Sequence, residues 1–195
     1  MDIIGGFTAL VIFAPVMLVV AVFLKIEGQN GSVFYGGYRI GRNGELFKCW
    51  KFRSMEPDSD HLLEALLESD PEIKKDWEKY QKLKVKDPRV TTKTAKIIRK
   101  VSIDELPQFW NVFIGQMSLV GPRPILEREK ELLAKDYQNY IKVRPGITGL
   151  WQVSGRNDTS FQRRIHMDSW YIRNWSIWGD IVIIIKTIKV ALKGF

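Results

Sequence analysis

The chain has 195 residues, of which 45% are hydrophobic and 12% aromatic, and its formal charge is +8. That length suits one folded domain with an appendage. A single cysteine excludes an internal disulfide, and two histidines are too few for a zinc site without several carboxylate ligands. Magnesium held by carboxylate and phosphate oxygens is therefore the metal that the sequence favours. The positive charge is compatible with nucleic acid, an anionic membrane surface or phosphorylated substrates.

The first predicted element is an uncharged run from Ile3 to Leu24, about as long as a membrane-spanning helix. A cleaved signal peptide fits this run worst, because no basic region precedes it and no small-residue cleavage site follows it. A spanning anchor and a re-entrant helix are the other two alternatives. Pro15 removes a backbone donor and kinks a helix, which favours a bend. Hydropathy alone does not separate the spanning form from the re-entrant form.

Residues 33–53 are predicted to form a β-hairpin. Asn43-Gly44 is a strong turn signal between the strand-like segments Tyr38–Ile40 and Leu46–Phe47. Basic residues occur throughout this segment: Arg39, Arg42, Lys48, Lys51 and Arg53. For each of them, a solvated face of the hairpin is as good an explanation as a binding role.

Helices are predicted on either side of Pro71. Leucines at helical spacing from Leu62 to Leu67 form one apolar stripe, and apolar residues continue at that spacing from Ile73 to Tyr80. Near the end of the chain, three lysines interrupt an aliphatic run that follows three tryptophans: Trp170, Trp175, Trp178, Lys186, Lys189 and Lys193. That run is either a buried aliphatic helix or an interfacial helix with snorkelling lysines.

Asp104 and Glu105 are the best candidates for chemistry. Ser102 and Glu105 match a capping box, but Pro107 would then lie one turn inside the helix. A helix that begins at Asp104 places Pro107 in its first turn, where proline is tolerated. The carboxylates would then lie at a helix N-terminus that also attracts phosphate, where an aspartate can act as nucleophile or magnesium ligand. On physical grounds alone, capping and catalysis remain equally good explanations.

Three cationic segments rich in turn residues could converge on this pair. They are Lys51-Phe52-Arg53, Gly121–Pro124 and Arg144–Gly146. Arginine binds phosphate through two parallel hydrogen bonds, and the prolines on both sides of Arg123 would stiffen its backbone. The Walker and dinucleotide fingerprints do not occur in the sequence.

Five strings, in this order, resemble the bacterial sugar transferase family, the monotopic polyprenyl-phosphate phosphoglycosyl transferases. They are KFRSM (51–55), DPRVT (87–91), SIDELPQFWNVFIGQMSLVGPRP (102–124), RPGITGLWQVSGRN (144–157) and DSWYIRNWSIWGDI (168–181). The resemblance extends over nearly the whole chain, and five ordered strings are far more specific than any one motif.

The resemblance implies an α+β, mainly helical fold. Residues 1–27 would form a re-entrant membrane helix broken at Ala14-Pro15, and residues 28–195 a compact cytosolic domain with a small β-hairpin and interfacial amphipathic helices. That domain would lie on the cytoplasmic face of the bacterial inner membrane. Ala14 departs from the family, in which serine often precedes the proline. Only Met1 precedes Asp2, where members usually carry basic residues, so either an anchor is missing or the chain is cut from a longer protein.

The resemblance also implies transfer of a hexose 1-phosphate from a UDP-sugar to undecaprenyl phosphate, with release of UMP. Asp104 would form a covalent phospho-sugar intermediate and contact Mg²⁺, and Glu105 would assist it, as a base for the lipid phosphate. The implied substrate-binding residues are Lys51, Arg53, Arg99, Pro122, Arg123, Arg144, Gln152 and Asp168.

The C-terminal strings look most like relatives that transfer galactose 1-phosphate or glucose 1-phosphate. Galactose is slightly favoured over glucose, and a di-N-acetylated sugar is a third alternative. The expected partners are a UDP-sugar, undecaprenyl phosphate and inner-membrane lipids, without nucleic acid, and homo-oligomer formation is left open. One rival hypothesis, a membrane-tethered nucleic-acid-binding protein, explains the charge but not the acidic pair. The other is a catalytically idle scaffold, against which intact Asp104, Glu105 and Arg123 speak.

Overall fold

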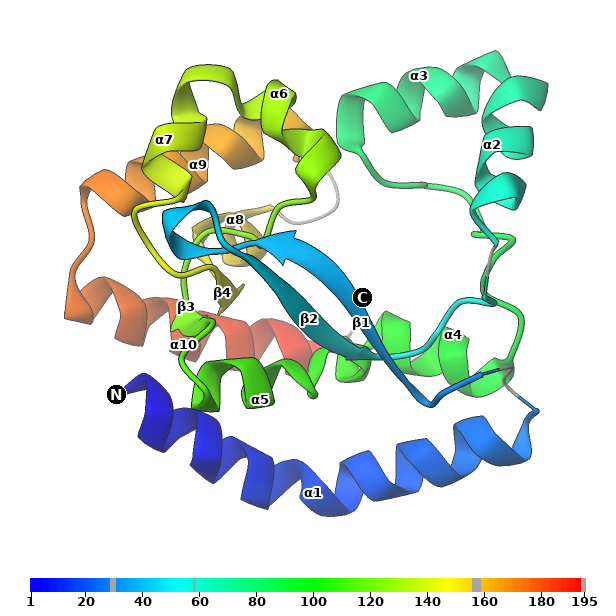
Figure 1. Cartoon of the computed structure of the whole chain (residues 1–195), viewed down its shortest axis with the longest axis horizontal. Helices are drawn as coiled ribbons and strands as arrows, with labels where there is room; N and C mark the ends of the chain where they lie inside the picture. The colour runs from blue at the N-terminus through cyan, green and yellow to red at the C-terminus, as the bar shows by residue number, and fades with distance from the viewer. Residues whose placement is uncertain (29–30, 58, 156–158, 194–195) are drawn as a thin grey trace.

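The computed structural model describes residues 1–28, 31–57, 59–155 and 159–193 (Figure 1). Its helices are α1 (Asp2–Ile26), α2 (Asp60–Ser69), α3 (Pro71–Tyr80), α4 (Lys93–Lys100), α5 (Gln108–Phe113), α6 (Lys130–Leu133), α7 (Tyr137–Tyr140), α8 (Leu150–Ser154), α9 (Phe161–Arg173) and α10 (Ile177–Lys193). Its strands are β1 (Phe34–Ile40), β2 (Leu46–Phe52), β3 (Ser118–Val120) and β4 (Gly146–Thr148). Short 3-10 turns cover Arg42–Gly44, Ile103–Glu105, Glu127–Glu129 and Ala134–Asp136. The prediction of a mainly helical α+β fold is confirmed.

The predicted hairpin is present as the antiparallel pair β1-β2, whose register runs from Phe34 opposite Phe52 to Ile40 opposite Leu46. The turn at Asn43-Gly44 is confirmed, since both residues adopt positive φ, 60° and 80°. The loop is longer than the predicted two residues, because strand pairing stops at Ile40 and Leu46. Asn43 N also donates to the carbonyl oxygen of Ile141 at 2.6 Å, which holds the tip of the hairpin against the end of α7.

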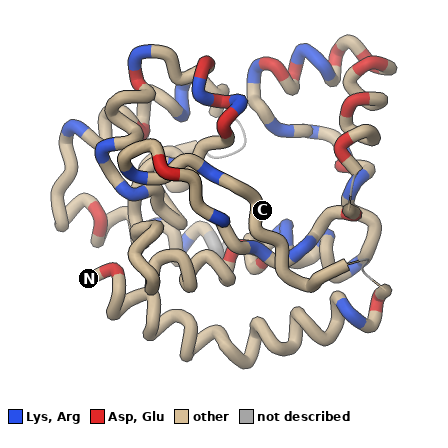
Figure 2. Tube along the Cα trace, viewed as in Figure 1, with Lys and Arg blue, Asp and Glu red and all other residues tan. Residues whose placement is uncertain are grey.

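Pro71 separates two helices, as predicted. It also begins the second one, because proline needs no hydrogen-bond acceptor in the first turn of a helix. The Asp70 carboxylate caps α3 by accepting from Glu72 N at 2.9 Å and Ile73 N at 3.2 Å. In Figure 1, α2 and α3 lie together at one side of the chain, and Figure 2 shows that both carry mixed charges.

A second, parallel sheet joins two of the cationic segments. β3 pairs with β4, with Ser118 opposite Gly146 and Val120 opposite Thr148. Just beyond the strands, Gly121 N donates to the Thr148 carbonyl at 2.9 Å and Gly146 N to the Pro122 carbonyl at 2.9 Å. A Cβ on Gly146 would collide with the backbone of Gly121, so glycine is required for this close approach. The segment 121–124 is therefore fixed beside residues 144–146.

The apolar helix α1 is continuous through Ala14 and Pro15, so the predicted helix-break-helix form is not what the structure has. The physical reason is that a proline removes one hydrogen bond while its own φ stays helical. Figure 1 shows that α1 is curved along its length. The re-entrant placement in a membrane, and the domain division at residue 27, stay predictions.

Both ends of α1 contact the remainder of the chain. At the first end, the Asp2 carboxylate accepts from Ser118 Oγ at 3.0 Å and Leu119 N at 3.2 Å. At the other end, Leu24 is fully buried in a cluster with Phe52 and residues of α4. Beyond the helix, the Glu27 carboxylate accepts from Thr94 N at 2.9 Å. The helix therefore lies along the domain and does not project from it (Figure 1).

Within the described part of the chain, α1 is the one helix long and apolar enough to cross a membrane. Figure 2 shows charged residues on it only near its two ends. The C-terminal helix α10 is not a fully buried aliphatic helix: Ile183 is buried against β3 and α9, whereas other apolar side chains are exposed. These exposed side chains are Ile177, Trp178, Val182, Ile185 and Ile188. The placement of this exposed apolar surface at a membrane interface stays a prediction.

Candidate active site

Asn111 fixes α5, and with it the acidic pair, against the hairpin. Its side chain is fully buried. Asn111 Oδ1 accepts from Trp50 N at 3.0 Å, and Nδ2 donates to the Lys48 carbonyl at 2.7 Å and to Gln116 Oε1 at 2.7 Å. A buried polar group with all its bonds made sets a specific register between two elements. The acidic pair, which just precedes α5, therefore meets the end of β2.

Asp104 and Glu105 lie in the 3-10 turn Ile103–Glu105, and this corrects both predictions for the start of the helix. Ser102 makes no side-chain capping bond, because its φ of 58° is left-handed and not the extended conformation of an N-cap. The α-helix begins only at Gln108, after Pro107. The pair therefore precedes a helix of six residues, and its surroundings depend mainly on side-chain charges.

Lys51, near the end of β2, bonds the pair directly, and its Nζ donates to Glu105 Oε1. Burial by itself would raise the pKa of Glu105. The charge and hydrogen bond of Lys51, with the charges of Arg123 and Arg99, outweigh burial and hold this pKa below its ordinary value. Burial opposes the charge of Lys51, but Glu105 and Asp104 raise the pKa of its ammonium group. Glu105 and Lys51 therefore both stay ionised near neutral pH.

Asp104 is in a different state from its neighbour. It is 8% exposed, and its burial, together with the negative charge of Glu105, raises its pKa to about 6. The charges of Lys51 and Arg99 partly oppose this rise. At pH 7 to 8 Asp104 is thus an ionised, desolvated carboxylate with a basicity well above that of a surface aspartate. That combination is what a carboxylate nucleophile needs.

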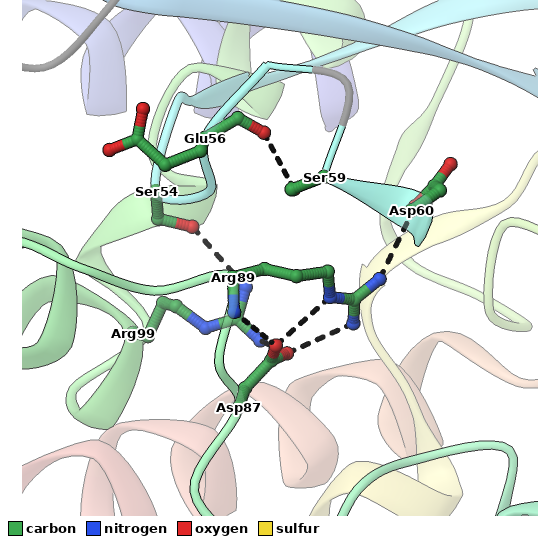
Figure 3. A network of polar contacts seen from close by, with 7 residues as sticks. All are labelled: Ser54, Glu56, Ser59, Asp60, Asp87, Arg89 and Arg99. Carbon is green, nitrogen blue, oxygen red and sulfur yellow. Dashed lines mark hydrogen bonds and ion pairs between the residues drawn. The ribbon is translucent and has the colours of Figure 1, made fainter. Parts of the chain in front are cut away.

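Arg99 connects the acidic pair to a second polar network, drawn in Figure 3. Its Nη1 donates to Ser54 Oγ at 3.3 Å, and its Nη2 lies 3.8 Å from Asp87 Oδ2. Asp87 is bound more closely by Arg89, through Nε and Nη2 at 2.9 Å each. Arg89, from the string DPRVT, is therefore a buried structural partner that orients Asp87.

Asp168 holds the backbone of Arg123 in place. Its Oδ2 accepts from Arg123 N at 3.1 Å and from Tyr140 Oη at 3.0 Å. Burial is nearly complete and raises the pKa of Asp168 to about 7. The Arg123 side chain lies 3.6 Å from Glu129 Oε1, and its charge also acts on Glu105. Pro122, just before it, is fully buried. Asp168 therefore affects the acidic pair indirectly, by holding the backbone of Arg123.

The predicted substrate-binding residues fall into two groups. Lys51, Arg99 and Arg123 act on the acidic pair through their charges, while Pro122 precedes Arg123 and Asp168 holds the Arg123 backbone. Arg53, the residue after β2, instead donates to the Ser32 carbonyl at 2.7 Å, and its guanidinium lies over the ring of Tyr35.

Two further predicted residues lie on other elements. Arg144 is exposed, and its guanidinium lies over Gly115, beyond the end of α5. Gln152 is on α8, where its side-chain oxygen faces Gly149. Among the described residues, Arg53 and Arg144 thus contact Ser32, Tyr35 and Gly115 and make no bond to Asp104 or Glu105.

Three residues that hold the site residues in place were not predicted from the sequence. Asn111, Tyr140 and Glu129 are buried and polar, and each bonds a different part of the site. One available signal was an asparagine inside the apolar run FWNVF, which predicts a buried polar group with fixed partners.

The residues present fit a magnesium ion only in part. No group of three His, Cys, Asp or Glu side chains suited to a metal occurs in the ranges that the structure covers. Of the two adjacent carboxylates, Glu105 is bound to Lys51, which leaves Asp104 as a donor. One or two carboxylates plus substrate phosphates is the usual donor set for Mg²⁺, so the site suits a metal that arrives with a diphosphate.

Comparisons with known proteins match almost the entire chain. The model of the family described as "Bacterial sugar transferase" matches residues 1–194. The chain is 49% identical over 98% of its length to a UDP-galactose-lipid carrier transferase of Erwinia amylovora, covering 39% of that protein. It is 48% identical over 98% of its length to an undecaprenyl-phosphate galactose phosphotransferase of Salmonella typhimurium, covering 40% of it.

A third relative carries a different sugar in its name. The chain is 41% identical over its full length to a UDP-glucose:undecaprenyl-phosphate glucose-1-phosphate transferase of Klebsiella pneumoniae, covering 39% of that protein. The chain thus spans about two fifths of the length of these curated relatives.

Proposed function

Because the chain belongs to the bacterial sugar transferase family, we propose that it transfers a hexose 1-phosphate from a UDP-sugar to undecaprenyl phosphate, releasing UMP. The observation that carries this proposal is the buried carboxylate Asp104, with a pKa of about 6, surrounded by the charges of Lys51, Arg99 and Glu105. The names of the relatives, which include two galactose and one glucose transferase, support the substrate classes.

In the first half-reaction, an Asp104 carboxylate oxygen attacks the sugar-bearing phosphorus of the UDP-sugar. A bond from this oxygen to phosphorus forms, the bond from phosphorus to the UMP oxygen breaks, and UMP leaves with the electron pair. Lys51, Arg99 and Arg123 bear on the pair electrostatically and would stabilise the negative charge that accumulates on the phosphate oxygens.

In the second half-reaction, an oxygen of undecaprenyl phosphate attacks the same phosphorus and releases the Asp104 carboxylate. Glu105 is a poor base for this step, because its pKa is held low and its side chain is bound to Lys51. Its part is instead to hold Lys51 and to raise the pKa of Asp104. An ionised phosphate needs no deprotonation before attack.

Asp104 would also hold Mg²⁺ together with phosphate oxygens of the substrate. When bound, the ion would neutralise charge on the transferred phosphate. Galactose is the sugar that we favour over glucose, since two relatives named for galactose are 48% and 49% identical and the one named for glucose is 41% identical.

Membrane attachment by α1 follows from its composition, and we extend the proposal to a monotopic placement on the cytoplasmic face of the inner membrane. Both ends of α1 are bound to the same domain, through Asp2 at one end and Leu24 and Glu27 at the other. A helix of this length is about 37 Å long, so a perpendicular spanning helix would carry one end across the membrane from the domain. Contacts at both ends support a helix that lies in the cytoplasmic leaflet.

Cysteine labelling tests this placement. Ile3→Cys and Lys25→Cys put thiols at exposed positions near the two ends of α1, and native Cys49 is buried and so serves as the silent background. We expect a membrane-impermeant maleimide to label both variants in inside-out vesicles and neither in intact cells. Labelling of Ile3→Cys from the periplasmic side would show that α1 spans the membrane.

Release of UMP tests the activity. The full chain in nanodiscs is incubated with undecaprenyl phosphate, Mg²⁺ and, one at a time, UDP-galactose, UDP-glucose and a UDP-di-N-acetylated sugar. We expect UMP and a lipid-linked sugar with UDP-galactose, more slowly with UDP-glucose. No UMP with any donor would remove the enzyme proposal and favour an idle scaffold.

A further inference from the structure

An open hollow of about 180 Å³ lies beside α4, and of its walls the mechanism above uses only Arg99. Its walls are Lys86, Asp87, Val90, Lys96 and Arg99. Lys96 and Arg99 are three residues apart on α4, so they share one face of that helix. Three of the five lining side chains are cations, and the volume exceeds what a single water molecule needs.

The positive charge of the hollow is not cancelled by its one acidic residue. Asp87 accepts two bonds of 2.9 Å from Arg89, which is 9% exposed (Figure 3). Lys96 Nζ donates to a neutral acceptor, the Thr91 carbonyl, at 3.0 Å. Within the described ranges, neither Lys86 nor Lys96 forms an ion pair with a carboxylate. The hollow is therefore a place where an anion would be stabilised.

Two residues of its wall relate the hollow to the acidic pair and to α1: Arg99 and Val90. On one side, the charge of Arg99 acts on Asp104 and on Glu105. On the other side, Val90 belongs to the apolar cluster that includes Val20 and Leu24 of α1. A ligand in the hollow would thus meet Arg99, whose charge acts on Asp104, and Val90, which packs in the same apolar cluster as α1. This is the position that a phosphate on a membrane-embedded chain needs.

We propose that this hollow is a phosphate subsite and that it receives the phosphate of the polyprenyl phosphate acceptor, held by Lys86 and Lys96 beside Arg99, whose charge also acts on Asp104. The assignment of the acceptor rests on the proposed function. A nucleotide phosphate has the same chemistry as a lipid phosphate, so the test must separate these two sources.

The test compares the wild-type full chain with the double variant Lys86→Ala/Lys96→Ala. Lys75→Ala is the control, because it removes a lysine from an exposed position of α3. Calorimetric titrations use farnesyl phosphate, a prenyl phosphate soluble enough to titrate, and UMP. We expect the double variant to bind farnesyl phosphate about tenfold or more weakly and UMP as the wild type does. In phosphatidylcholine nanodiscs, the KM for undecaprenyl phosphate should rise by about the same factor, with kcat within about twofold.

The outcomes are distinguishable. Weaker UMP binding with unchanged farnesyl phosphate binding would overturn the acceptor assignment in favour of the nucleotide. Equal binding of both ligands by the wild type and the double variant, or no binding of farnesyl phosphate by the wild type, would overturn the subsite itself. If the wild type binds farnesyl phosphate but transfers no sugar, and the double variant loses that binding, then the subsite stands while the proposed function fails.

Discussion

Replacement of Asp104 by asparagine should abolish sugar-phosphate transfer, with a loss of about 10³-fold or more, because the amide cannot act as the carboxylate nucleophile. The variant should also form no phospho-sugar adduct when it is incubated with a UDP-sugar and Mg²⁺ without acceptor. Intact-protein mass spectrometry measures that adduct directly. Glu64→Gln, at an exposed position of α2, is the matched control and should keep activity within about twofold.

The same variant should be more stable than the wild type. Burial and Glu105 raise the pKa of Asp104 from 3.8 to about 6, so the fold disfavours the ionised form. Above pH 6 this costs the wild type on the order of 2 to 3 kcal/mol, which asparagine avoids, and the difference should shrink as pH falls toward 4.5. Thermal unfolding in detergent at both pH values measures it. An adduct that persists in Asp104→Asn would place the nucleophile elsewhere, and Glu105→Gln would then be the variant to examine.

Replacement of Lys51 by methionine should lower activity at pH 7 by about 10²-fold, since it removes the cation bound to Glu105 and leaves two adjacent carboxylates with less compensation. In the wild type, activity should fall as pH drops through about 6, where Asp104 becomes protonated. This fall is the acidic limb of the pH profile. In Lys51→Met the acidic limb should move to higher pH, because Lys51 has the largest effect among the charges that lower the pKa of Asp104. The pH dependence of kcat/KM for the UDP-sugar measures both effects.

Two further variants make the result specific to this charge. Lys51→Arg keeps the cation and should restore the position of the acidic limb, though not the full rate, because the guanidinium has a different shape. Lys48→Met removes an exposed lysine from the same strand and should leave the limb unchanged. If the acidic limb in Lys51→Met coincides with that of the wild type, then Asp104 is not the group whose protonation limits the reaction.

The local features of the fold were predictable from sequence. The left-handed turn at Asn43-Gly44 and the helix start at Pro71 depend on φ preferences of single residues, which the sequence displays directly. The apolar character of α1 depends on composition alone. The start of the helix after Asp104 was not predictable, because Ser102 takes a left-handed conformation that its residue type does not favour.

By itself, the sequence determined that Asp104 and Glu105 are a carboxylate pair, that an apolar helix precedes the domain, and to which family the chain belongs. Only the tertiary structure decided how each carboxylate behaves. Lys51 is 54 positions from Glu105 along the chain, and the two meet because Asn111 bonds α5 to β2. That contact keeps Glu105 ionised, while burial raises the pKa of its neighbour Asp104. Ion pairs and burial depend on contacts between distant segments, which local preferences do not specify.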